Sequence, residues 1–99
     1  MTVVGVGGIE IIFWKKRRSF HKEYGKLEIS LRDSVDKCLQ ALAKRPIPSG
    51  LRFEKLKGYA KPDIYSVHVT GNYKISMEIE GNIAILRRVA SHDEIDRCP

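Results

Sequence analysis

The sequence predicts an α+β domain: an N-terminal strand, then two helices packed on one face of a mainly antiparallel sheet of four or five strands. Apolar residues in its first half recur at the 3.6-residue period of helices. After residue 64 they alternate with polar residues, which is typical of strands with one buried face. The chain of 99 residues is long enough for one hydrophobic core. We therefore expect residues 9–99 to form a single domain.

The N-terminal segment predicts a leader and a first strand. Residues 1–8 contain Gly5, Gly7 and Gly8 but lack the third glycine of a dinucleotide fingerprint, so we expect a flexible leader. Residues 9–14 are rich in β-forming residues and predict the strand. The apolar stretch precedes its basic residues, which is the reverse of a signal peptide, and we expect a cytoplasmic protein.

Two helices are predicted next. Phe20, Tyr24 and Leu27 follow the i, i+4, i+7 spacing of a short helix, which Gly25 could interrupt. His21 lies among the lysines of the opposite face, and we expect it on the surface. The second helix has a broader apolar stripe, formed by Leu31, Val35, Cys38, Leu39 and Leu42.

The ends of the second helix carry start and stop signals. Ser30 followed by Asp33 resembles a capping box, although residues 27–29 could extend the helix backward. Pro46 and Pro48 prevent its continuation. Cys38 on its apolar face is expected to be a small core residue, because two cysteines form neither a disulfide framework nor a zinc motif.

The second half predicts strands joined by tight turns. Residues 65–70 and 73–79 alternate in polarity, and Gly71-Asn72 between them signals a two-residue hairpin. Residues 80–82 predict the next turn and residues 83–89 the next strand. A last helical turn is expected over residues 93–97. The polar positions of the first two strands face away from the aliphatic core, where a site would lie: Ser66, His68, Lys74 and Ser76.

Positive charge is concentrated in two blocks. The net charge is +6, and residues 15–26 and 44–61 each hold six basic residues against one acidic residue, or +5 apiece. If the blocks come together in the fold, they form an electrostatic footprint for phosphates. Nucleic acid is therefore the first class of ligand to consider.

A series of short motifs carries a resemblance to a known family. The series is Gly50-Leu51-Arg52-Phe53-Glu54-Lys55-Leu56-Lys57-Gly58, Ile64-Tyr65-Ser66-Val67-His68-Val69, Gly71-Asn72-Tyr73-Lys74-Ile75, an aliphatic strand, and His92-Asp93-Glu94. In order and spacing it resembles the RelE/ParE superfamily of toxins from toxin–antitoxin systems.

The resemblance implies a toxin that a cognate antitoxin neutralises in a hetero-oligomer. RelE-like members cut mRNA on the ribosome and so inhibit translation, whereas ParE-like members inhibit DNA gyrase without chemistry of their own. A third alternative is a degenerate toxin that only binds its antitoxin. The site residues have to decide between these functions.

By the same resemblance, several residues acquire roles. Lys74 takes the place of the arginine that usually contacts the scissile phosphate, and Ser66 and His68 correspond to basic residues of the preceding strand. His92 opens the terminal segment, where the family has Arg or His. Asp96 stands where a tyrosine is common. These departures from the pattern favour the two alternatives, whereas the two histidines favour the nuclease. The function we predict is therefore that of a RelE-like endoribonuclease acting on translated mRNA.

Metal-free RNA cleavage needs a base for the ribose 2′-OH, an acid for the leaving oxygen and positive charge for the phosphorane. His68 and His92 suit both proton roles, with neither assigned. Lys74 with Arg87 or Arg88 would stabilise the developing charge, although these arginines could instead pair with Glu78 or Glu80 across the strands. RNA contacts are expected from Arg52, Lys55, Lys57 and Ser66. No ligand spacing indicates a metal ion, and no cofactor is expected.

Overall fold

The computed structural model describes residues 11, 13–44, 47–60 and 63–99, with the side chains of residues 57–60 excepted. The expected leader, residues 1–8, lies outside these ranges. The elements are β1 (Phe13–Lys16), α1 (Arg18–Gly25), α2 (Ile29–Leu42), a 3-10 turn η1 (Ser49–Leu51), β2 (Glu54–Ala60), β3 (Asp63–His68), β4 (Tyr73–Glu80), β5 (Ile83–Ser91) and α3 (His92–Arg97). The predicted α+β class is confirmed.

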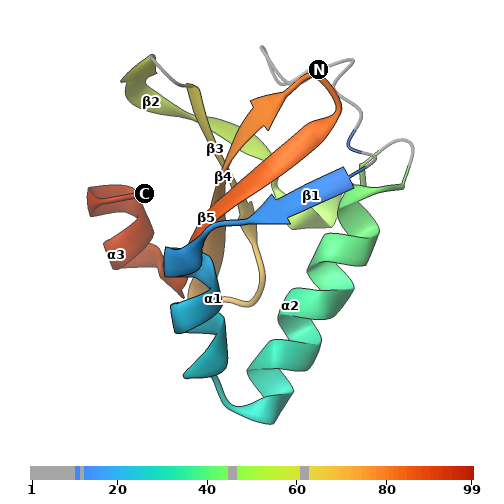
Figure 1. The fold of residues 1–99 in the computed structure, drawn as a ribbon, viewed down its shortest axis with the longest axis vertical. Helices are drawn as coiled ribbons and strands as arrows, with labels where there is room; N and C mark the ends of the chain where they lie inside the picture. Colours follow the sequence, from blue (N-terminus) through green and yellow to red (C-terminus); the bar gives the residue numbers. More distant parts are fainter. Residues whose placement is uncertain (1–10, 12, 45–46, 61–62) are drawn as a thin grey trace.

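The strands form one five-stranded sheet in the order β1-β5-β4-β3-β2. β1 pairs with β5 in parallel, and all other pairs are antiparallel. In Figure 1, α2 lies along one side of the sheet and the short α3 on the other. The sheet therefore has two covered faces of different kinds.

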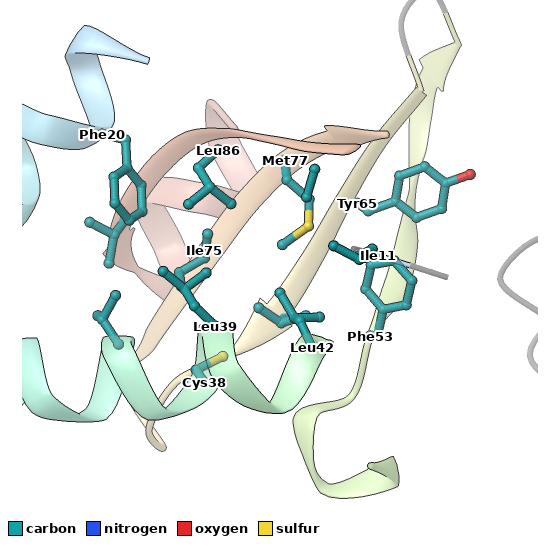
Figure 2. Packing of buried hydrophobic residues seen from close by; sticks show 14 residues of the cluster. Ile11, Phe20, Cys38, Leu39, Leu42, Phe53, Tyr65, Ile75, Met77 and Leu86 are labelled. Atoms are coloured by element: carbon teal, nitrogen blue, oxygen red, sulfur yellow. The ribbon is translucent and has the colours of Figure 1, made fainter. Parts of the chain in front are cut away.

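The hydrophobic core lies between α2 and the sheet. Val35, Cys38, Leu39 and Leu42 of α2 are buried, as their spacing predicts. Figure 2 shows Leu39 and Leu42 directed toward the sheet, where β4 carries Ile75 and Met77. Burying each large aliphatic side chain contributes about 1.5–3 kcal/mol, so this layer stabilises the domain.

Two predicted element boundaries are wrong. β1 runs past Trp14 to Lys16, because Lys15 and Lys16 continue the parallel pairing with β5; of the expected strand, residues 9, 10 and 12 lie outside the described ranges. α2 begins at Ile29 with Glu28 as its N-cap, so Ser30 is inside the helix and caps nothing. The second helix therefore begins before Ser30, as the alternative interpretation of its start expected.

The two-residue hairpin at Gly71-Asn72 is also wrong. The Val69 N–H donates to the Tyr73 carbonyl (2.9 Å), which leaves a three-residue loop over residues 70–72. The Thr70 hydroxyl accepts from the N–H groups of Asn72 and Tyr73 (both 3.2 Å). That hydroxyl stabilises a longer turn, and Asn72 has no positive φ, which a type I′ turn requires.

The next turn is the tight one. Glu80 pairs with Ile83, so only Gly81 and Asn82 lie between β4 and β5. Gly81 has φ 59°, a conformation that glycine adopts without strain.

Candidate active site

The sheet face opposite α2 brings together polar side chains of three neighbouring strands. Register pairs Ser66 with Ser76 and His68 with Lys74, and Arg88 lies across from Ser76. This is the face that the alternation predicted. It is not open, however, because α3 packs on it through the fully buried Ile95.

Two histidines meet at the edge of this face. The rings of His68 and His92 lie edge to face with centroids 4.6 Å apart. β5 runs directly into α3, and the His92 N–H donates to the Asn72 carbonyl (2.9 Å) at the β3–β4 turn. The backbone thus fixes His92 beside the end of β3, where His68 lies.

The surroundings of His68 favour its neutral form. Partial burial lowers the pKa of His68, and the nearby His92, Lys74 and Arg52 lower it further, while Glu54 acts in the opposite direction. A histidine that stays neutral near pH 7 has a free nitrogen lone pair. His68 is therefore suited to accept a proton.

Lys74 lies beside this pair but is already paired. Its side chain is 8% exposed, and its Nζ lies 2.9 Å from Oδ1 of Asp96 on α3. The Asp96 side chain is 55% exposed. The charge of Lys74 is therefore balanced by the Asp96 carboxylate.

Arg88 is held by two carboxylates. Its Nη2 donates to Oε2 of Glu23 (2.6 Å) on α1 and to Oε2 of Glu94 (2.8 Å) on α3, and its Nη1 donates to the Cys98 carbonyl (2.8 Å). The hydrogen bonds that Arg88 donates to Glu23 and Glu94 raise the pKa of Arg88, and the same bond lowers the pKa of Glu94. Arg88 is a permanent cation that joins α1, β5 and α3.

Arg87 has a different environment. It lies at an irregularity in the β4–β5 pairing and donates to Glu78, which also binds Arg17 (2.8 Å). The cross-strand pairing with Glu78 is confirmed. Of the two arginines, Arg88 lies opposite Ser76 on the sheet face that carries His68 and Lys74, whereas Arg87 forms an ion pair with Glu78.

The expected RNA-contacting residues are dispersed. Arg52 is exposed after η1, and its charge reaches His68. Lys55 pairs with Asp63 (3.4 Å) and is 42% exposed. Lys57 lies in β2, with its side chain outside the described set. Ser66 is fully buried, and its hydroxyl has no hydrogen-bond partner among the described residues.

Sequence reasoning missed the two glutamates on Arg88. For Glu94 the sequence held a local signal, because Ser91 followed three residues later by Glu94 is the pattern of a helix start, and the Ser91 hydroxyl does accept from the Glu94 N–H (3.4 Å). The Glu94 carboxylate, however, pairs with Arg88. No local pattern indicated the contact of Glu23, because Glu23 and Arg88 are 65 residues apart in the chain.

Within the described ranges, no group of three or more His, Cys, Asp and Glu side chains is placed to hold a metal ion. None of the described helices has the length and apolar character needed to cross a membrane.

Comparison with known proteins gives structural likeness alone. No protein-family model and no curated protein matches the chain. A chain of the RelB–RelE antitoxin–toxin complex from Methanococcus jannaschii matches at TM-score 0.65 and 25% identity, covering 86% of this chain and 99% of that one.

Two bacterial structures agree. The Escherichia coli DinJ–YafQ toxin–antitoxin complex matches at TM-score 0.69 and 13% identity, covering 88% of this chain and 98% of the other. A YoeB/ParE toxin from Agrobacterium tumefaciens matches at 0.66 and 12%, covering 82% and 99%. With the confirmed α+β fold, these likenesses show that the chain has the fold of the RelE-like toxins from toxin–antitoxin systems.

Proposed function

We propose that this chain is the toxin of a toxin–antitoxin module and cleaves mRNA on the ribosome. The observation that carries the proposal is the pair of histidine rings, 4.6 Å apart, on the sheet face that also holds Lys74. Two imidazoles beside a cation provide the proton transfers and the charge that RNA cleavage without a metal requires.

The proposed reaction is attack of the ribose 2′-oxygen on the adjacent phosphorus. Neutral His68 accepts the 2′-OH proton, since its pKa is lowered. The new O2′–P bond forms as the P–O5′ bond breaks, and the His92 imidazole donates a proton to the leaving O5′. The products are a 2′,3′-cyclic phosphate and a free 5′-OH. Lys74 and Arg88 stabilise the charge that develops on the phosphorane.

A cognate antitoxin is the proposed partner. Structurally similar toxins have been solved as complexes with RelB and DinJ antitoxins. The +6 charge of this chain favours an acidic or amphipathic antitoxin segment. Because translated mRNA and a cognate antitoxin are both found in the cytoplasm, we propose that the protein acts there.

The ion pairs of the site support a second candidate function. Lys74 and Arg88 are both held by carboxylates, and a lysine at position 74 lacks the bidentate fork of arginine. A protein that inhibits DNA gyrase by binding, or that only binds its antitoxin, needs neither cation free.

The test is mRNA cleavage on programmed ribosomes. His68→Ala and His92→Ala should each lower the cleavage rate on the order of 10²-fold, because each removes a proton-transfer group. His21→Ala is the matched control, since His21 is exposed on α1 and distant in sequence from both histidines. Gyrase supercoiling is assayed on the same preparations.

The outcomes separate the candidates. Cleavage that both site variants lose and His21→Ala keeps supports the nuclease. Equal rates in all four proteins would remove histidine from the mechanism. Inhibition of supercoiling without cleavage would identify the binding protein instead.

A further inference from the structure

α3 places a carboxylate on each cation that the proposed cleavage needs. Asp96 Oδ1 lies 2.9 Å from Lys74 Nζ, and Glu94 Oε2 lies 2.8 Å from Arg88 Nη2. These are distances at which a lysine or arginine also binds a phosphate oxygen. We propose that the carboxylates of Asp96 and Glu94 occupy the positions that phosphate oxygens of the substrate would take, so that α3 is an acidic cover that RNA must displace. This inference rests on the proposed function.

The charge balance around the cations agrees with this role. Lys74 and Arg88 are met by three carboxylates, those of Asp96, Glu94 and Glu23. The site thus lacks the excess positive charge of the chain as a whole, which is +6. A phosphodiester that approaches Lys74 must compete with the Asp96 carboxylate, which is already paired with this lysine. Asp96 therefore lowers the affinity of the site for RNA.

The buried hydroxyls on the Lys74 face point the same way. Ser66 and Ser76 face each other on β3 and β4, are fully buried, and have no hydrogen-bond partner among the described residues. Leaving a buried hydroxyl unpaired is unfavourable. α3 packs against β4 and β5, so its displacement would open this face beside the released Lys74 and bring the Ser76 hydroxyl within reach of ribose and phosphate oxygens.

The attachment of α3 permits such a displacement. The helix has six residues, and Ile95 is its one buried residue. Its other anchors are at the surface: the ion pairs, in which the Asp96 and Glu94 side chains are 55% and 51% exposed, and the bond from Arg88 to the carbonyl of Cys98, the C-cap residue. A helix this short has little stability of its own. His92 is held separately by the Asn72 carbonyl, so α3 can open beyond His92 while that residue keeps its place.

The experiment measures how RNA affinity depends on salt. The probe is a short single-stranded 2′-O-methyl RNA, which has no nucleophilic 2′-OH, so binding is separated from cleavage. Asp96→Asn should bind it about tenfold more tightly at low salt, since Lys74 becomes free for a charge-assisted bond. The slope of log K against log[salt] should steepen by about 0.7, the value for one more phosphate contact on a single strand.

Three control variants isolate the ion pair. Asp93→Asn removes the same charge from the exposed side of α3 and should leave the slope unchanged. Asp96→Glu keeps a carboxylate and should behave as the wild type. Adding Lys74→Gln to Asp96→Asn should cancel the gain. Thermal unfolding confirms that each variant is folded.

The inference is overturned if Asp96→Asn and Asp93→Asn have equal slopes, if the gain survives Lys74→Gln, or if no variant binds the RNA. Its failure is distinct from that of the proposed function. A steeper slope without cleavage of mRNA supports the acidic cover and refutes the nuclease. Histidine-dependent cleavage with unchanged slopes refutes the cover alone.

Discussion

The two faces of the sheet are both buried, but by opposite means. The α2 face is filled by aliphatic and aromatic side chains that contact one another without directional requirements. The α3 face is held by ion pairs, and the same face carries the buried hydroxyls of Ser66 and Ser76. The first arrangement contributes to stability through burial of apolar surface. The second leaves polar groups without partners among the described residues, a departure from local rules that is typical of functional or strained sites.

The largest effect on stability is expected from the α2 face. Leu42→Ala should lower the free energy of unfolding by about 2–5 kcal/mol, because Leu42 is fully buried and leaves a cavity. Urea denaturation measures the loss. Gln40→Ala, at an exposed position of the same helix, is the control and should change stability by less than about 0.5 kcal/mol. Equal effects would show that α2 does not organise the core.

A smaller effect of opposite sign is expected from the α3 face. Ser76→Ala removes a fully buried hydroxyl that has no partner among the described residues, so it should raise the free energy of unfolding by up to about 1 kcal/mol. The same denaturation experiment measures it. A loss above about 1 kcal/mol would mean that the hydroxyl is satisfied in solution and that the two faces differ less than described.

The smallest effect concerns pH. The pKa of His68 in the folded protein is below its ordinary value of 6.5, so the unfolded chain binds the proton more strongly. The contribution of His68 to stability is therefore present above pH 6.5 and is lost as the pH falls through and below that value. Thermal unfolding measured between pH 7.5 and 5 should show this loss as a lower melting temperature at the acidic end.

Two variants sharpen that prediction. His68→Gln should flatten this part of the stability profile, because it removes the titrating group. Arg52→Gln should move the transition toward pH 6.5, since the Arg52 charge is one of the causes that lower the pKa of His68. An unchanged profile in His68→Gln would assign the transition to another group.

Prediction from sequence succeeded where local pattern decides the structure. The spacing of Val35, Cys38 and Leu42 fixes the buried face of α2, and alternation places His68 and Lys74 on the opposite side of the sheet. The order of short motifs was enough to indicate the superfamily. In these cases the sequence pattern and the structure that it predicts involve residues that are close together in the chain.

It failed where distant groups compete for the same partner. The capture of Arg88 by Glu23 joins residues 65 positions apart, and no local period records it. The turn after β3 depends on whether the Thr70 hydroxyl or the Gly71-Asn72 dipeptide determines the backbone, and the hydroxyl does. The burial of Lys74 could not be predicted without knowing that α3, which follows β5, packs against β4 and brings Asp96 to this lysine.

The position of β5 has a consequence for the order of events during synthesis. In the described sheet, β1 pairs with β5 alone, and β5 is the last strand along the chain. The sheet is therefore completed only after residues 83–91 have left the ribosome, and His92 becomes available later still. On the proposed function, the nascent chain cannot act on RNA before this point, because His68 and His92 meet only after both have emerged and β5 has joined the sheet.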